Sequence, residues 1–583
     1  MPLPIFSGTL GVKRAAHLLR RAAFGGLKAD IDAFAPLTAT SAVSNLFNNN
    51  LDDPLLPIDP LTGTEWISTG ALESGSEEGE LQEYFKGWFL GQMVASGYNG
   101  NLRLTCQARE KIVLFMHTHF TTKQSVVNDS RALYFQNQLF RSYAFDKAPA
   151  EDFNFKNLAK KICVDNAMLK FLDGRLNVKG NPNENFAREL MELYTIGRGL
   201  EGTLPPLVEE GDYYNYKEQD VQAAARVLSG FDTDDTYSTI DIDTGLPRGR
   251  ARGGDNATQH DMDIKQFSDR LNNAVIAPDS LLLSDPNVTN EEVALDEISQ
   301  FIELLYSMNE TARYICRKVY RFYVYHNITQ EIEDNIIAEM AATFTGSGFK
   351  IQNVIEELLM SQHFYDANAG LDDNNFGGII KSPLDLILNT TRFFNLPLPD
   401  YQNDTLRFYE TTGELLRSLE YQGLNFYEPF EVAGYTAYHQ FPVYNRNWIS
   451  TNYLTRRYDF IQQFFEGMNM MDPLNSFDLL QFIRDNIPLN IAENAESLII
   501  ALAEYLLPVS DNLTFSDNDG TAEITGERLR YFRHAFLFDP QIDADPLSAW
   551  TFRWNNLVEV EVVRNQLKNL MNAMLQSPEY QLM

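Results

Sequence analysis

Two histidines stand two residues apart in the segment "REKIVLFMHTHFTTKQ", at positions 117 and 119. Imidazole is a common metal ligand and a general acid or base near neutral pH. On a continuous helix the side chains of His117 and His119 point about 200° apart, which prevents chelation of one ion. The sequence predicts that the helix ends near Thr118, and a turn there would let both rings converge. The alternative is two hydrogen-bonded histidines at the edge of the core.

A third histidine, His260, is followed by Asp261 and then by Lys265 in "NATQHDMDIKQF". A carboxylate next to an imidazole can fix the tautomer that a ligand histidine needs. These residues form a second candidate group for the same site.

The segment "GNPNENFARELMELYTIGRG", residues 180–199, concentrates polar residues before and within a predicted helix. Asn183 is a suitable N-cap, since its side-chain oxygen can accept from free amides of the first turn. Glu184 would lie at the positive end of the helix dipole. Gly197 can take the left-handed conformation that closes a helix. Asn183 and Asn185 are also candidate ligands or hydrogen-bond donors.

The helical wheel separates the charges of this segment. Phe186, Leu190 and Leu193 recur at spacings of four and three and so share one buried face. Arg188 and Glu192 lie away from it, as an exposed pair at i and i+4. Glu189 lies at the edge of the buried face, where a carboxylate needs a cation, a donor or a metal as its partner. A buried structural salt bridge and a functional site both satisfy that need.

The composition limits the classes of partner. The 583 residues include 47 Lys and Arg against 80 Asp and Glu, a formal charge of −33. With no basic surplus to neutralise phosphates, we expect no nucleic-acid binding. No apolar run is long enough for a transmembrane helix. The three cysteines are too far apart for a disulfide framework or zinc cluster. The first residues lack the pattern of a secretory signal, which predicts a cytoplasmic location.

Helical periodicity dominates the chain, and predicts a mainly α, large multi-helix globular domain with long acidic loops and a small β-element. Helices are predicted at 82–97, 107–118, 128–141, 155–171, 184–196, 218–229, 292–307, 309–325, 330–345, 350–362, 382–394, 409–419, 446–466, 476–486, 493–506 and 557–576. We expect one unit over 1–583, an acidic loop insertion at 48–80, a loop and β insertion at 231–291, and a C-terminal helical part at 395–583. "STIDIDTG" and "HDMDIKQF" are predicted to pair as strands.

Several segments, in order, resemble a bacterial family known as domain of unknown function 1800. They include "HLLRRAAFG", "FMHTHFTT", "NAMLKFLDGRLNVKGNPNENFARELMELYTIG", "YKEQDVQAAARVLSGF", "HDMDIKQF", "TARYICRKVYRFYV", "IKSPLDLILNTTRFF", "GLNFYEPFEVAGY" and "LQSPEYQ". The chain departs from the family pattern at four positions: Met116 for an aromatic residue, Lys217 for Thr, Asp263 for Gly and Tyr435 for Trp.

The resemblance spans nearly the whole chain, and it implies a location and a partner. Members of the family are often exported, and are often encoded beside a second family that looks like alkaline phosphatases and sulfatases. A cell-envelope location is therefore the alternative to a cytoplasmic one. A phosphatase- or sulfatase-like protein is the partner that the resemblance implies.

Two function classes follow. The first is a binding or scaffolding protein that partners such a hydrolase-like protein. The second is a metal-assisted hydrolase, in which His117, His119, His260 and one carboxylate, Glu189 or Asp261, hold zinc or iron and activate water. In either class we expect Asn183, Glu184, Asn185, Arg188 and Lys265 to form a polar network around the histidines.

Overall fold

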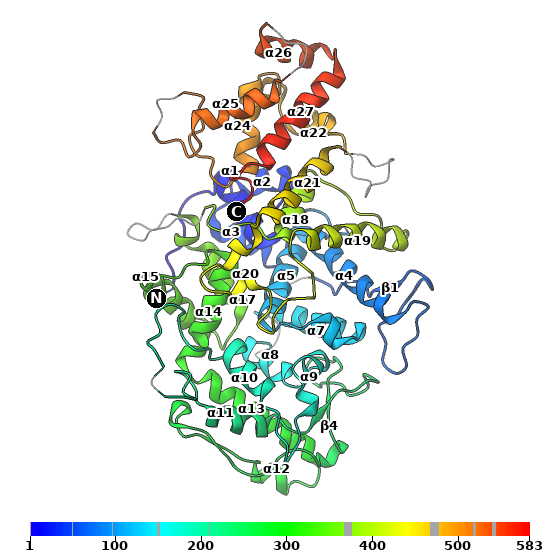
Figure 1. Ribbon diagram of the computed structural model, residues 1–583, viewed down its shortest axis with the longest axis vertical. Coiled ribbons are helices and arrows are strands. Elements are labelled where there is room, and N and C mark those ends of the chain that lie inside the picture. The colour runs from blue at the N-terminus through cyan, green and yellow to red at the C-terminus, as the bar shows by residue number, and fades with distance from the viewer. Residues whose placement is uncertain are drawn as a thin grey trace.

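The structure, a computed structural model, describes residues 2–48, 51–95, 97–147, 152–207, 209–366, 376–466, 477–516, 520–538 and 544–583. Helices make up most of it, and the strands form only short two-stranded pairs (Figure 1). The predicted mainly α fold is confirmed. Among the described residues, no helix is long and apolar enough to cross a membrane.

The N-terminal third packs around α5, a helix whose residues from Leu104 to His117 are all buried. A helix buried on every side needs internal partners for its polar side chains, and α5 carries both His117 and His119. The helices of this part are α1 (Gly11–Ala23), α2 (Lys28–Phe34), α3 (Ala39–Leu46), α4 (Glu78–Val94), α5 (Gly100–His119), α6 (Gln124–Val127), α7 (Ser130–Ala144), α8 (Phe155–Ile162) and α9 (Asn166–Phe171).

The middle third contains the segment rich in polar residues. Its helix begins as α10 (Asn185–Glu189) and widens into a π-helical turn, η2 (Leu190–Tyr194). The other helices here are α11 (Glu218–Val227), α12 (Ser280–Ser284), α13 (Asn290–Tyr306), α14 (Asn309–Tyr323), α15 (Gln330–Ile332), the π turn η5 (Glu333–Ile337), α16 (Ala338–Gly346), α17 (Ile351–Met360) and α18 (Pro383–Phe393).

The C-terminal part supplies the remaining helices, and the last of them gather at the upper end of Figure 1. They are α19 (Thr405–Tyr421), α20 (Thr436–His439), α21 (Thr451–Glu466), α22 (Leu479–Asn486), α23 (Leu489–Ala492), α24 (Ala495–Leu506), α25 (Gly526–Phe536), α26 (Pro546–Asn556) and α27 (Val560–Leu575). The sequence predictions missed α25 and α26. Both are rich in aromatic and basic residues, which have weak helical propensity or blur the apolar stripe.

The strands are all very short. β1 (Ile58–Asp59) pairs with β2 (Thr64–Glu65) inside the predicted acidic loop. β3 (Phe231–Asp232) pairs with β4 (Arg250–Ala251), and β5 (Lys265–Gln266) pairs with β6 (Val275–Ile276). The predicted pairing of "STIDIDTG" with "HDMDIKQF" was therefore wrong, because each segment finds a partner close by in the chain. Short 3-10 turns complete the fold: η1 (Gly174–Leu176), η3 (Gly254–Asn256), η4 (Asp269–Leu271), η6 (His363–Tyr365) and η7 (Tyr444–Trp448).

Candidate functional site

The polar residues before α10 shape its start. The side-chain oxygen of Asn183 accepts from the backbone amide of Asn185 at 3.0 Å. The backbone amide of Asn183 in turn donates to the side chain of Asn177 at 3.1 Å, and the Asn185 amide group donates to the carbonyl of Leu172 at 3.3 Å. The helix has Glu184 at its N-cap position and no side-chain cap, so the predicted N-cap role of Asn183 was wrong; its side chain instead forms a turn with Asn185 just before the helix.

The charged residues of this helix pair differently from the prediction. Arg188 donates to both carboxylate oxygens of Glu218 on α11, at 2.6 and 3.0 Å, and to Glu184 at 3.4 Å. Glu192 instead accepts from Arg198 at 2.6 Å and from the hydroxyl of Tyr216 at 2.9 Å, so it is not the exposed partner of Arg188. Glu192 lies in the π turn, and Arg188 is taken by Glu218 on α11, a partner that the helical wheel of one helix could not show.

Glu189 is half-buried, as the wheel indicated, but its expected partner is missing. No described residue forms a hydrogen bond or ion pair with its carboxylate. Burial raises the pKa of Glu189 to about 7, and the nearby negative charge of Glu192 adds to this rise. A carboxyl group of this kind is protonated part of the time at neutral pH.

Side chains from α5 and α14 close the end of this helix. The carbonyl of Leu193 accepts from the ammonium group of Lys318 at 2.7 Å and from the hydroxyl of Tyr314 at 3.1 Å. The Nε2 of His119 donates to the carbonyl of Tyr194 at 3.0 Å. Burial lowers the pKa of Lys318 to about 7, and holds the pKa of His119 well below its usual value. These donors satisfy terminal carbonyls that have no partner within the helix.

His117 points into different surroundings. Its ring stacks on Tyr427 with centroids 4.0 Å apart, and its Nε2 forms a hydrogen bond with the hydroxyl of Tyr435 at 3.3 Å. Burial lowers the pKa of His117 to about 3. Since α5 runs through both histidines, the two rings diverge as i and i+2 side chains of a helix must.

His260 belongs to a third, fully buried group. Its Nδ1 donates to the carbonyl of Ser229 at 2.8 Å, and its Nε2 lies 2.5 Å from a carboxylate oxygen of Glu297 on α13. The ammonium group of Lys265 donates to both oxygens of Glu297 at 2.6 Å. Asp261 pairs instead with Arg226 at 2.7 Å.

The sequence predictions did not include Glu297, although the chain carries a signal for it. Glu297 lies three residues after Ala294 and four before Phe301, within the apolar stripe of α13. A carboxylate in such a stripe must find a buried partner.

The structure does not bring the five predicted ligands into one set. His117, His119 and His260 each contact a different partner, Asp261 pairs with Arg226, and no described residue forms a hydrogen bond or ion pair with Glu189. Over the ranges that the structure describes, no three His, Cys, Asp or Glu side chains gather as metal ligands would. The three cysteines lie within those ranges, and they are buried and free.

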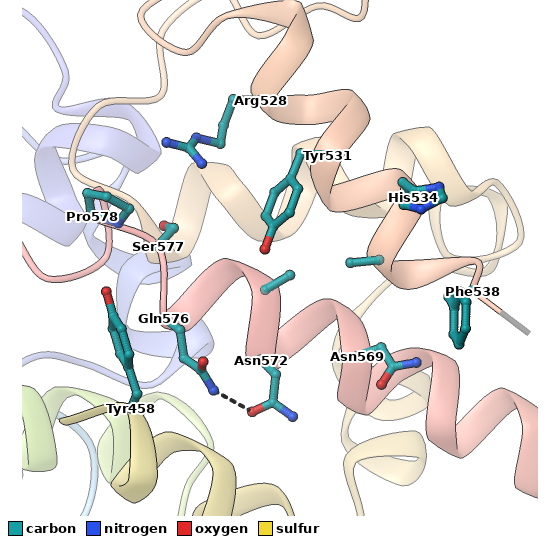
Figure 2. A pocket seen from close by; sticks show the side chains of 12 residues that line it. Tyr458, Arg528, Tyr531, His534, Phe538, Asn569, Asn572, Gln576, Ser577 and Pro578 are labelled. Atoms are coloured by element: carbon teal, nitrogen blue, oxygen red, sulfur yellow. Dashed lines mark hydrogen bonds between the residues drawn. The ribbon is translucent and has the colours of Figure 1, made fainter. Parts of the chain in front are cut away.

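An open pocket lies elsewhere, between α25 and α27 (Figure 2). Its volume is about 560 Å³. Figure 2 shows Tyr531 of α25 pointing toward α27, and Asn572 and Gln576 of α27 extending toward the helix that carries Tyr458. The lining residues are Tyr458, Arg528, Tyr531, His534, Ala535, Phe538, Asn569, Asn572, Ala573, Gln576, Ser577 and Pro578.

The lining follows helical spacing on both sides. On α25, Arg528, Tyr531 and His534 are three residues apart, and Asn569 and Asn572 repeat that spacing on α27, so each set shares a face. The Gln576 amide donates to Asn572 at 3.2 Å, and Arg528 donates to Glu579 at 3.0 Å. The Tyr531 side chain is 51% exposed. The amide stripe within the predicted helix 557–576 was a signal for this pocket, but the opposite wall lies on the missed helix α25.

Comparison with known proteins places the chain among related sequences. The model of a family described as "Protein of unknown function (DUF1800)" matches residues 17–582. Neither the curated proteins nor the solved structures contain a significant match.

Proposed function

The chain belongs to the DUF1800 family, and from this premise we propose that it is a binding protein. In this proposal the pocket between α25 and α27 takes a polypeptide segment of a protein partner. The pocket lies in the C-terminal helical part, residues 395–583. The open pocket, whose described lining residues include aromatic, amide and basic side chains and no carboxylate, is the observation that carries the proposal, with Glu579 beside it bound to Arg528.

The lining suits a polypeptide. Tyrosine and arginine are enriched in the centres of protein interfaces, where their large side chains supply most of the affinity. Tyr531 and Arg528 stand together here, with the guanidinium 5.9 Å from the ring centroid. Carboxamides such as those of Asn569 and Asn572 can both donate to and accept from a peptide backbone. In a chain of net charge −33, a wall without carboxylates avoids repelling an acidic segment.

The histidines and charged residues that were candidate ligands in the sequence also support the proposal, because their hydrogen bonds are formed within the protein. The side chains of His260, Lys265 and Glu297 bind one another, and His119 and Lys318 bind the end of the helix. Groups whose hydrogen bonds are formed internally hold the fold together and are not free to bind a ligand.

The family resemblance supplies the class of partner. A phosphatase- or sulfatase-like protein of the cell envelope is the proposed partner, as expected from the sequence. The alternative, a metal-assisted hydrolase, needs His117, His119 and His260 in one ligand set. The separate partners of these three rings give that alternative no support.

Binding by paired variants tests the proposal. The chain is immobilised, and a phosphatase- or sulfatase-like protein encoded beside it is titrated over the surface. Tyr531→Ala is expected to weaken binding about tenfold or more, as truncation of a central aromatic residue does. The control is Tyr421→Ala, because Tyr421 is 55% exposed and lies 5.7 Å from the guanidinium of Arg456, an environment like that of Tyr531.

Two outcomes would overturn the proposal. One is the absence of measurable binding by the wild-type chain. The other is equal binding by the two tyrosine variants, which would place the interface away from the pocket.

A further inference from the structure

Three buried cations meet where α1, α18 and α21 come together with the last residues of the chain. The exposed fractions of Arg20, Lys381 and Arg457 are 5%, 0% and 0%. The guanidinium of Arg457 donates to the carbonyl of Lys381 at 3.0 Å, and burial, with the charges of Arg20 and Arg457, lowers the pKa of Lys381. The three therefore form one basic cluster.

The partners of this cluster are neutral. Lys381 donates to the carbonyl of Tyr580 at 2.7 Å, and its ammonium group lies 3.5 Å from the centroid of the Tyr580 ring. Arg457 donates to the side chain of Gln581 at 2.7 Å, and Arg20 makes a long contact of 3.4 Å with the carbonyl of Tyr505. In the described part of the chain, no carboxylate oxygen lies within ion-pair distance of these cations.

Several other buried cations of this protein have a carboxylate partner, whereas buried Arg131 donates to the carbonyls of Ser68, Gly70 and Asp235. Arg141 pairs with Glu110 at 2.6 Å, Lys265 with Glu297 at 2.6 Å, and Arg317 with Glu333 at 2.8 Å. Asp385 is the acidic residue whose charge reaches both Lys381 and Arg457, but its oxygens bind Lys111 at 2.6 Å and Ser382 at 2.7 Å. Burying cations without an ion-pair partner is unfavourable. An anion bound beside the basic cluster would therefore stabilise the fold.

A small cavity lies against the cluster. It is lined by Arg20, Lys381, Asn389, Tyr580, Tyr505 and Gly25, among other residues, and its volume is about 20 Å³. The Nη1 of Arg20 is buried, and no described residue forms a hydrogen bond with it. This volume admits one particle of about the size of a water molecule. A phosphate or carboxylate ligand would be too large.

We propose that this cavity binds a single chloride ion between Arg20 and Lys381. The ion supplies the negative charge that the basic cluster lacks, and it accepts a hydrogen bond from the Nη1 of Arg20. Because Arg20 belongs to α1 and Lys381 precedes α18, the ion joins the N-terminal helix to the middle of the chain. The site is separate from the pocket between α25 and α27.

Crystals soaked in sodium bromide test the site directly, since bromide replaces chloride and scatters anomalously. One ordered anomalous peak in contact with the Arg20 guanidinium and the Lys381 ammonium group is expected. A water molecule or no density in the cavity, while bromide occupies other sites, would overturn the proposal.

A solution experiment gives an independent result. Replacing sodium chloride with sodium gluconate at equal ionic strength should lower the Tm of the wild-type chain by about 1–2 °C, since chloride stabilises only the folded state. Arg20→Gln should abolish this difference. Arg417→Gln, which changes an exposed arginine paired with Glu414, should retain it. Equal chloride dependence in both variants would contradict the proposal. If Arg20→Gln does not fold, the bromide experiment on the wild-type chain decides.

Discussion

Polar side chains bond one another at one end of the molecule and line an open pocket at the other. Around α10, α11 and α13, toward the lower end of Figure 1, carboxylates, cations and imidazoles bind one another or bind helix ends. Between α25 and α27, helices at the upper end of Figure 1, Tyr531, His534 and Asn569 line an open pocket (Figure 2). All the candidate site residues outside α5 were predicted in the first region, because its sequence is dense in charge. No site residue was predicted in the second region.

A high density of buried polar residues therefore indicates mutual hydrogen bonding rather than a free binding site. A charge beneath the surface is tolerated only with a partner, so buried polar residues occur in sets that satisfy each other. Such sets look like catalytic sites in a sequence. A binding surface needs the opposite condition, which is polar and aromatic groups that the fold itself leaves free.

The largest expected effect is at Glu297. Glu297→Ala leaves Lys265 and His260 buried without their carboxylate, and should lower the free energy of unfolding by about 3–5 kcal/mol. Glu303→Ala on the same helix is the control, because Glu303 pairs with Lys156 and Lys160 at the surface and should cost under about 1 kcal/mol. Urea denaturation measures both. Equal small losses would show that the buried group is not structural.

The open region should respond in the opposite way. Tyr531→Ala should change the free energy of unfolding by less than about 1 kcal/mol, since the side chain is half-exposed, while it weakens partner binding about tenfold. Denaturation and binding are measured on the same preparation. A large loss of stability with unchanged affinity would make Tyr531 a structural residue like Glu297.

Glu192 tests the corrected pairing within the closed region. Glu192→Ala removes the acceptor for the buried hydroxyl of Tyr216 and for Arg198, and should cost about 1–2 kcal/mol. Thermal or urea denaturation at pH 7 measures the loss. A change below about 0.3 kcal/mol would instead support the exposed position of Glu192 that the helical wheel predicted.

Replacement of Glu189 should have the smallest effect on the free energy of unfolding, and it should stabilise the chain where the other substitutions destabilise it. Its pKa is about 7 in the folded chain against an ordinary value of 4.5, so the folded state binds the proton more tightly than the unfolded state. The ionised carboxylate therefore destabilises the fold above pH 7, and this cost disappears as the pH falls toward 4.5. Glu189→Gln should stabilise the chain by roughly 0.5–1 kcal/mol at pH 8, after allowance for solvent screening of a partly exposed group.

Melting temperatures at pH 5 and pH 8 check this sign. The variant and the wild-type chain should differ little at pH 5, and the variant should be the more stable at pH 8. Destabilisation at both values would reveal a partner for the ionised Glu189 that the structure does not contain.

Local sequence was enough to predict most of the longer helices, although not α25 and α26, because helical period depends on neighbouring residues. It was also enough to place Glu189 at the edge of the core. The partners of these residues depend on contacts across the chain. Glu297 lies 37 residues from His260, and Tyr427 and Tyr435 reach His117 from a distant segment. The partner of Arg188, Glu218, also comes from another helix, 30 residues away in the chain.

The most direct test of the central claim is amide hydrogen exchange of the chain with and without the phosphatase- or sulfatase-like partner. Binding at the pocket predicts new protection in residues 526–538 and 569–578, with unchanged exchange in residues 183–197 and 260–265. Protection confined to residues 183–197 and 260–265 would contradict it, and would show that the closed polar region is the functional site.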